Sequence, residues 1–296
     1  MRVTTVTVQT VPPTSPSFSS AARRVRALVA LGDSTAVGLG DPLPGRGWRG
    51  FPALLRDALG GPGEVVLTNL SRTGARMACV RREQLPVALT CRPDVAVLVV
   101  GMNDTLRSDF DPVALRADCA TTVGALRAAG AHVLMLRYHD HTRVFWLPAP
   151  LRRALRRRIE ELNAVTDAIG ASDPRRIGVL DLHLLPGGYE RAAWSVDRLH
   201  PSERGHRMLA AGFATLLTGA GFAVPEPVGL GCSGGRTVTA VHRAGWLVVK
   251  GVPWLARRGR DLAPVIVQGL ASELSRGPAA SRWTAPPHPG PGLRGR

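Results

Sequence analysis

Five short runs of valine, leucine, isoleucine and alanine, separated by longer amphipathic stretches, constrain the fold of this chain more than any other feature. The runs span residues 27–31, 65–70, 95–100, 133–136 and 177–182. Nearly continuous apolar sequence of this length is typical of strands buried on both faces, as in a parallel sheet with helices on either side. The alternation therefore predicts an α/β domain with a five-stranded parallel sheet in a three-layer α/β/α arrangement.

The stretches between these runs contain helices with recognisable ends. Asp111 followed by Pro112 forms an N-cap and first-turn pair, and Gly130 is a C-terminal stop for the helix between them. Apolar residues at spacings of three and four predict a second helix over 151–169 and a third over 203–217. Because parallel strands need right-handed crossovers, we expect an open, doubly wound sheet of the flavodoxin-like type.

The second of these predicted helices carries a cluster of arginines away from its apolar stripe. Such a cluster is typical of a solvated helix surface, and an anion-binding face is the alternative. The cluster consists of Arg152, Arg153, Arg156, Arg157 and Arg158.

The chain is strongly basic, with 38 Lys and Arg residues against 22 Asp and Glu residues and a net charge of +16. Arginines are spread along the whole chain and no basic cluster is interleaved with aromatic residues, so nucleic-acid binding is not expected. Residues 1–24 are polar and unpatterned and are expected to form a disordered leader. The folded domain is predicted at 25–218, and a basic extension containing Pro and Gly follows at 219–296.

The C-terminal extension holds half of the net charge. Residues 233–296 contain ten Lys and Arg residues against two acidic residues. Within them, 246–258 mixes tryptophan, aliphatic and basic residues, which favours peripheral contact with an anionic membrane surface, with packing on the folded domain as the alternative. The N-terminal residues have no apolar targeting segment and no run of eighteen apolar residues occurs, so a cytoplasmic protein is expected.

Metal and redox chemistry have little support in the sequence. His139-Asp140-His141 and His183 suggest a metal site, but alternating histidines on one loop seldom complete a coordination shell. We therefore expect no metal and no cofactor. The cysteines follow no CxxC spacing and are expected to be free thiols, with a bridge between the first two only in an exported protein. They are Cys79, Cys91, Cys119 and Cys232.

Polar and flexible residues follow three of the predicted strands at the point where each strand ends. Ser34 comes after the first strand in the tripeptide Gly32-Asp33-Ser34, Gly74 after the second and Asn103 after the third. The carboxyl ends of parallel strands share one edge of a sheet, and ligands bind there. A serine in a tight turn at this edge is a candidate nucleophile. The Gly74 N–H and the Asn103 amide are candidate donors to a negative oxygen.

A candidate base lies near the end of the predicted domain, in Asp197-Arg198-Leu199-His200-Pro201. An Asp three residues before a His on a turn can reach the imidazole Nδ1, which leaves Nε2 free to accept a proton. Pro201 restrains the backbone of His200 to extended conformations. Together the loops supply a nucleophile, a base, an orienting acid and oxyanion donors.

These motifs resemble the four blocks of the SGNH, or GDSL, hydrolase family. Gly32-Asp33-Ser34, Gly74, Gly101-Met102-Asn103-Asp104 and Asp197-Arg198-Leu199-His200 occur in the family's order over about residues 25–218. The resemblance implies an SGNH-hydrolase fold and catalytic domain, with Ser34 as nucleophile, His200 as base and Asp197 as its partner. It also implies an oxyanion hole formed by the N–H groups of Ser34 and Gly74 and the Asn103 amide. Thr35 stands where leucine is usual, which leaves the subfamily and the substrate open.

The function implied by the resemblance is cleavage of carboxylic esters, of the esterase or lipase type, through an acyl-enzyme on Ser34. The ester could belong to a small molecule, a lipid or a carbohydrate. Two alternatives remain: an acyltransferase that uses the same acyl-enzyme, and a non-catalytic anion-binding protein. Aromatic residues near the edge of the sheet are candidates for an apolar substrate wall. They are Trp48, Phe145, Trp146 and Trp194.

Overall fold

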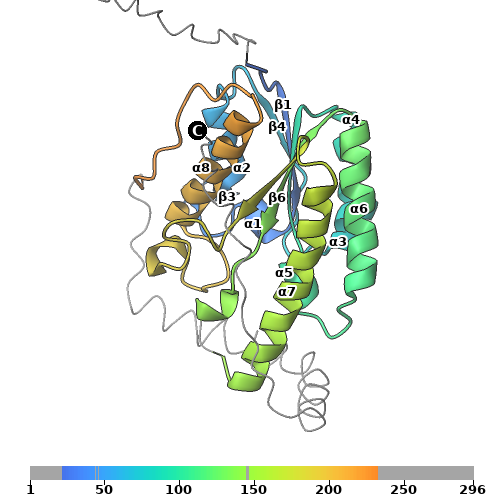
Figure 1. The fold of residues 1–296 in the computed structure, drawn as a ribbon. Helices are drawn as coiled ribbons and strands as arrows, with labels where there is room; N and C mark the ends of the chain where they lie inside the picture. Colours follow the sequence, from blue (N-terminus) through green and yellow to red (C-terminus); the bar gives the residue numbers. More distant parts are fainter. Residues whose placement is uncertain (1–21, 44, 46, 145–146, 233–296) are drawn as a thin grey trace, which may run out of the picture.

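The computed structural model describes residues 22–43, 45, 47–144 and 147–232, which form a three-layer α/β/α fold (Figure 1). The central sheet is parallel and five-stranded, with strand order β4-β1-β5-β6-β7. The predicted α/β fold and five-stranded parallel sheet are therefore confirmed. The strands span Ala27–Gly32 (β1), Val66–Asn69 (β4), Val95–Val99 (β5), His132–Arg137 (β6) and Ile177–Asp181 (β7).

The order of the strands already points to a position for the site. β1 lies between β4 and β5, so that Leu28 pairs with Leu67 on one side and with Val95 on the other. This is the flavodoxin-like order, in which ligands bind outside the carboxyl ends of the strands where the winding reverses. The segment that follows β1, beginning at Asp33, therefore lies at the edge where a ligand is expected.

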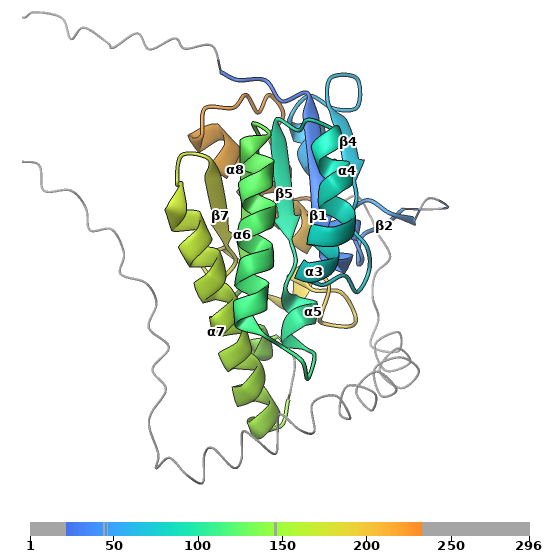
Figure 2. The same ribbon diagram turned by 90° about the vertical axis from the view of Figure 1, so that its right-hand side faces the viewer.

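Helices cover both faces of the sheet (Figures 1 and 2). One face carries α2 (Gly50–Ala58) and α8 (Glu203–Gly219), and the other carries α4 (Leu85–Thr90), α6 (Pro112–Ala128) and α7 (Ala149–Ser172). Every residue of β5 is buried, as expected for a central strand covered on both sides. The core is thus continuous across the sheet.

The three predicted helices correspond to α6, α7 and α8. The Asp111 carboxylate caps α6 by accepting hydrogen bonds from two N–H groups of its first turn. The helix α7 begins two residues earlier than its apolar pattern indicated, because Pro150 fits the first helical turn without a donor, and it ends three residues later. Ser202 caps α8, which begins at the predicted residue.

The arginine cluster of α7 is divided between solvent and neighbouring segments. Arg152, Arg153 and Arg157 are exposed. The Arg156 guanidinium lies 2.7 Å from the Asp140 carboxylate. A solvated helix surface therefore describes the exposed part of the cluster.

Several short elements had no signal in the sequence, because each is too short to show a periodic apolar pattern. Two of them, β2 and β3, form an antiparallel hairpin. The short helical elements include one π-helical turn, η1, and two 3-10 turns, η2 and η3. The elements are α1 (Ser34–Val37), β2 (Pro42–Leu43), β3 (Gly47–Trp48), α3 (Met77–Cys79), η1 (Val80–Gln84), α5 (Met102–Thr105), η2 (His141–Arg143) and η3 (Arg191–Ala193).

The predicted leader and extension lie mostly outside the described residues. These exclude 1–21 and 233–296, and with them the segment for which membrane contact was predicted. The parts that are described lie against each other, since the Arg23 N–H donates to Gly221 O at 2.9 Å and the Arg23 guanidinium lies over the Phe222 ring. Within the described part of the chain, no helix has the length and apolar character needed to cross a membrane.

Position 32, the last residue of β1, requires glycine because of its backbone conformation and its close neighbours. Its φ is 143°, and a Cβ there would lie 1.9 Å from the carbonyl oxygen of Val99 in β5. We expect Gly32→Ala to lower the free energy of unfolding by about 3 kcal/mol or more, measured by urea denaturation.

Gly124 of α6 is a matched control, because a Cβ there would meet no atom within 4 Å. Gly124→Ala should be neutral or stabilise the helix by up to about 1 kcal/mol. Equal losses of stability in the two variants would contradict the role assigned to Gly32.

Candidate active site

Ser34 follows β1 and is the first residue of the short helix α1. The Asp33 carboxylate caps this helix by accepting a hydrogen bond from the Thr35 N–H at 3.0 Å. The N–H of a first helical residue has no partner within its helix. The turn therefore brings both the hydroxyl and the N–H of the predicted nucleophile to the carboxyl edge of the sheet.

The backbone just before Ser34 is held by Gln84, a residue that the sequence did not single out. Gln84 is buried at the end of the π-helical turn η1, and its amide accepts from the Gly32 N–H at 2.8 Å and donates to Gly32 O at 3.0 Å. Two hydrogen bonds from one planar amide fix the end of β1. A π-helical turn has no short-range sequence pattern that would have revealed this contact.

The structure brings Ser34, His200 and Asp197 into one hydrogen-bonded chain. His200 Nε2 lies 2.8 Å from Ser34 Oγ, and His200 Nδ1 lies 2.6 Å from Asp197 Oδ2. The carboxylate can only accept, so Nδ1 carries the proton and Nε2 is left as the acceptor for the serine hydroxyl. This is the proton arrangement that a serine nucleophile requires.

Asp197 is held by more than its contact with the imidazole. Its Oδ1 accepts hydrogen bonds from Ser195 Oγ at 2.6 Å, from the Leu199 N–H at 2.9 Å and from the His200 N–H at 3.0 Å. Burial raises the pKa of Asp197, but the hydrogen bonds and charge of His200 and the Ser195 hydroxyl outweigh burial and lower this pKa to about 2. The Asp197 carboxylate therefore stays ionised at neutral and mildly acidic pH.

The other predicted donors lie at the turns after β4 and β5. The Asn103 amide donates to Ala75 O at 3.2 Å and to Asp33 Oδ2 at 3.4 Å, so it lies between these turns and the one that carries Ser34. Gly74 is next to Ala75, has a φ of 79°, and has no atom within 4 Å of the place where a Cβ would stand. The space beside the Gly74 backbone is thus open, and the role of its N–H as a donor stays a prediction.

The pKa of Asp33 is shifted in the opposite direction to that of Asp197. Asp33 is buried, and burial is the main reason why its pKa is raised to about 6, against the opposing hydrogen bonds from Thr35. Burial also raises the pKa of the neighbouring Asp104, whose carboxylate accepts from the Met77 N–H at 3.2 Å. Neither aspartate was assigned a role from the sequence, where Asp33 read only as part of the turn.

Residues on either side of the Ser34–His200 contact line an apolar cavity. Thr35 follows the nucleophile, Leu199 and Pro201 flank His200, and all three line the cavity together with Trp194 and Tyr138. The space open to the centres of water-sized molecules is about 40 Å³. At about 10–15 Å³ for each water, this is room for about three water molecules or one small apolar group.

The four aromatic candidates for a substrate wall have different positions. Trp194 lines the cavity, and its indole N–H donates to Gly188 O at 2.9 Å. Trp48 lies on the hairpin strand β3, is 45% exposed, and is not among the residues that line this cavity. Phe145 and Trp146 lie outside the described residues.

The histidines that suggested a metal site pack among aromatic rings. His139 is completely buried, stacks on Trp194 with ring centroids 5.2 Å apart, and meets Tyr189 edge-on. Burial lowers the pKa of His139 to about 2, so this imidazole is neutral. His183 Nδ1 lies 2.8 Å from the Tyr189 hydroxyl. Among the residues that the structure describes, no group of His, Cys, Asp and Glu side chains is arranged to hold a metal ion.

Comparison with known proteins identifies the class. Residues 30–208 match the model of the GDSL-like lipase/acylhydrolase family. The chain belongs to this family of hydrolases, and the resemblance seen in the sequence is confirmed. A search of curated protein sequences finds no match.

Solved structures share the fold. TesA is 25% identical, with a TM-score of 0.51 over 66% of this chain and 99% of its own. LAE5, an alpha/beta hydrolase enzyme from the metagenome of Lake Arreo in Spain, is 20% identical, with a TM-score of 0.53 over 66% of this chain and 96% of its own. Axe2, an acetylxylan esterase from Geobacillus stearothermophilus, is 17% identical, with a TM-score of 0.52 over 66% of this chain and 95% of its own. At these identities, LAE5 and Axe2 support the fold alone.

The raised pKa of Asp33 predicts a pH dependence of stability. Its native pKa of about 6 lies above the ordinary value of 3.8, so the folded protein binds this proton more tightly than the unfolded chain. The stabilisation from this group is complete below about pH 4 and is lost as the pH rises through about 6. Asp33→Asn keeps the shape of the side chain and cannot ionise.

The stability of Asp33→Asn relative to the wild type should therefore rise by about 2 kcal/mol of unfolding free energy from about pH 4 to about pH 8. Urea denaturation of both proteins at the two pH values measures this change, and any constant effect of the substitution cancels. The same difference in stability at both pH values would show that Asp33 is not protonated more readily in the folded protein.

Proposed function

We propose that the protein is a serine esterase that cleaves carboxylic esters through an acyl-enzyme on Ser34. The observation that carries this proposal is the hydrogen-bonded chain from Ser34 Oγ through His200 to Asp197. A hydroxyl bonded to a neutral imidazole, which is itself oriented by a carboxylate, is arranged to lose its proton during attack. Membership of the GDSL-like lipase/acylhydrolase family supports an ester as the bond that is cleaved.

In the acylation step, Ser34 Oγ attacks the carbonyl carbon of the ester while His200 Nε2 takes the hydroxyl proton. Asp197 stabilises the imidazolium that forms. The carbonyl oxygen becomes negative and accepts hydrogen bonds from the Ser34 N–H, the Gly74 N–H and the Asn103 amide. The amide exchanges its long 3.4 Å contact with Asp33 Oδ2 for this oxygen. His200 then gives the proton to the leaving alcohol oxygen, the C–O bond breaks, and the acyl group stays on Ser34.

Deacylation repeats these roles with water. His200 Nε2 takes a proton from a water molecule whose oxygen attacks the acyl carbon, and the same donors stabilise the negative oxygen. The carboxylic acid leaves as the proton returns to Ser34 Oγ. The enzyme is regenerated without a net change in its protons.

The apolar cavity supports a substrate with a small apolar acyl group. Its wall begins at Thr35, next to the nucleophile, and its lining is formed mainly by aliphatic and aromatic side chains. Burial of an apolar acyl group there is favourable by roughly 0.8 kcal/mol for each CH₂ that leaves water. The gain should end when the chain becomes longer than the cavity.

The direct test is hydrolysis of a graded series of p-nitrophenyl esters, from acetate to octanoate. The wild type should cleave them, with kcat/KM highest for short acyl chains. Ser34→Ala should lose at least about ten-thousandfold in kcat, because the nucleophile is removed. Ser172→Ala, at the C-terminal end of α7, is the matched control and should keep wild-type turnover. Hydrolysis by Ser34→Ala at the wild-type rate would exclude an acyl-enzyme on Ser34.

Asn103 provides a second test, aimed at the transition state. Asn103→Ala should lower kcat by about a hundredfold or more with KM little changed, since one oxyanion donor contributes about 3 kcal/mol. Asn103→Asp, which keeps the size but replaces the donor by a carboxylate, should be at least as slow. Thermal unfolding checks that both variants are folded. Wild-type turnover in Asn103→Ala would remove this amide from the oxyanion hole.

A further inference from the structure

The residues at 38–41 and 49–51 lie against the residues that follow His200, although the two parts are far apart in the sequence. A Cβ at Gly40 would lie 1.9 Å from the carbonyl oxygen of Pro201, so the two backbones touch there. The Pro201 backbone leads directly from His200 into α8. The loop after the nucleophile is therefore in contact with the loop that carries the base.

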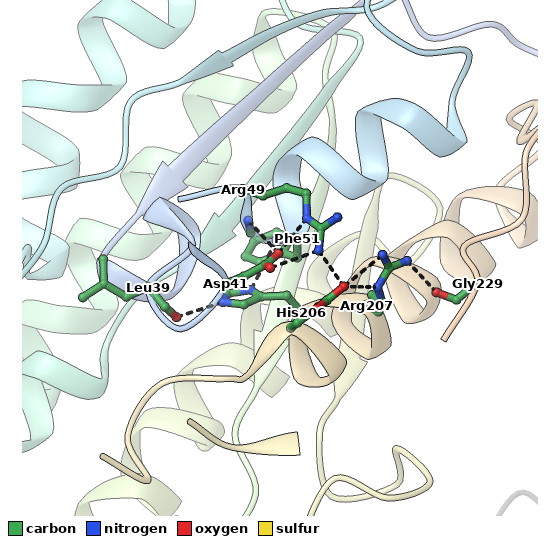
Figure 3. Close-up of polar contacts among 9 residues, drawn as sticks. Leu39, Asp41, Arg49, Phe51, His206, Arg207 and Gly229 are labelled. Carbon is green, nitrogen blue, oxygen red and sulfur yellow. Dashed lines mark hydrogen bonds and ion pairs between the residues drawn. The ribbon is translucent and has the colours of Figure 1, made fainter. Parts of the chain in front are cut away.

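Four charged side chains join these loops, and we call them the Arg49 network: Asp41, Arg49, Glu203 and Arg207 (Figure 3). The Arg49 guanidinium donates to both carboxylate oxygens of Asp41, at 2.9 and 3.0 Å, and its Nη2 also donates to Glu203 Oε1 at 2.9 Å. Glu203 is the first residue of α8, three residues beyond His200. Arg49 thus holds the loop after Ser34 to the start of α8.

Arg207 extends the Arg49 network along α8. Its Nε donates to Glu203 Oε1 at 3.1 Å, and its Nη1 donates to Gly229 O at 3.0 Å (Figure 3). The Glu203 carboxylate therefore accepts from two guanidinium groups and is fixed in one position. Its contact with Arg49 is correspondingly well defined.

His206 makes a second connection between α8 and the loop after Ser34. Its Nδ1 accepts from the Phe51 N–H at 3.2 Å, and its Nε2 lies 2.9 Å from Leu39 O (Figure 3). A backbone N–H can only donate and a carbonyl can only accept, so the ring is neutral with its proton on Nε2. The Leu39 N–H in turn donates to the carbonyl oxygen of Ser34 at 3.1 Å. A line of hydrogen bonds therefore leads from α8 to the nucleophile's own backbone.

Burial separates this arrangement from an ordinary surface ion pair. The side chains are 3% (Asp41), 19% (Arg49), 11% (Glu203) and 13% (Arg207) exposed, and His206 is completely buried. An exposed pair would be free to rearrange and would fix little. A planar guanidinium shared by the buried Asp41 and the largely buried Glu203 has one geometry, and a shift of either loop would break it.

We propose that Arg49, through Asp41 and Glu203, and His206 are positioning residues that hold the Ser34 hydroxyl within hydrogen-bonding distance of the His200 imidazole. As it concerns turnover, the proposal rests on the proposed esterase function. Ser34 and His200 stand 166 positions apart and belong to different loops. A displacement of one loop by about 1 Å is enough to cost up to about a hundredfold in rate. The Arg49 network and His206 oppose such a displacement.

The test compares Arg49→Lys with Arg127→Lys. A lysine at position 49 keeps a positive charge beside Asp41, but a single ammonium group cannot reproduce the fork that reaches Asp41 and Glu203 together. Arg127 pairs with Asp173 at the opposite, amino-terminal edge of the sheet, where both side chains are also partly buried. Arg49→Lys thus weakens the link between Asp41 and Glu203, Arg127→Lys weakens the pair with Asp173, and only the first of these joins the loops of the site.

Arg49→Lys should lower kcat for p-nitrophenyl acetate by about tenfold to a hundredfold with KM little changed, and Arg127→Lys should stay within about twofold of the wild type. Glu203→Met should resemble Arg49→Lys, and the double variant should lose no more than the slower single variant, because both break the same link. His206→Phe, which keeps a ring against Phe51 but neither hydrogen bond, should also lower kcat. Additive losses, or equal kcat in Arg49→Lys and Arg127→Lys, would overturn the proposal.

A readout that does not need turnover keeps the proposal separate from the esterase function. The ¹⁵N chemical shift of His200 Nε2, assigned by its loss in His200→Gln, responds to the hydrogen bond from Ser34 and should move in Ser34→Ala. In Arg49→Lys the chemical shift of His200 Nε2 should move toward its value in Ser34→Ala. In Arg127→Lys this chemical shift should stay at the wild-type value. An unchanged shift in Arg49→Lys would overturn the positioning role. A wild type that shows the hydrogen bond but cleaves no ester would count against the proposed function alone.

Discussion

The hydrogen bond between Ser34 Oγ and His200 Nε2 is the contact on which the rest of the site depends. The sheet by itself places Ser34 at the site, because Ser34 follows β1. It also places the turns with Gly74 and Asn103 there, because they follow the neighbouring strands β4 and β5. His200 comes from the connection after β7, at the edge of the sheet and two strands away from β5. That long connection has to return to β1, and contacts outside the sheet must hold it there.

Two aspartates near Ser34 show how the fold sets charge. Asp197 accepts hydrogen bonds from a hydroxyl, two backbone N–H groups and an imidazole, and its pKa falls to about 2. Asp33 is also buried but has fewer donors, and its pKa rises to about 6. The number of donors thus decides which carboxyl loses its proton more readily. Asp197, with the lower pKa, contacts His200, where a positive charge would develop.

The sheet, the three long helices and the motifs at the ends of the strands could be predicted from the sequence, because apolar periodicity and turn residues act over a few positions. The contacts that hold the motifs in place could not. Gln84 reaches Gly32 from a π-helical turn, and Arg49 meets Glu203 across 154 positions. Such partners depend on how short, non-periodic segments pack, and no local pattern in the sequence reports that packing. The same is true of Trp48, which is aromatic but stands exposed on a hairpin.

The most direct measurement is mass spectrometry of protein quenched with acid during turnover of a short-chain ester. We expect an adduct with the mass of the acyl group, located after proteolysis on the peptide that contains Ser34, and absent from protein quenched before the ester is added. An adduct located on a different residue, or continued turnover with no adduct even when deacylation is slowed at low temperature, would contradict this expectation.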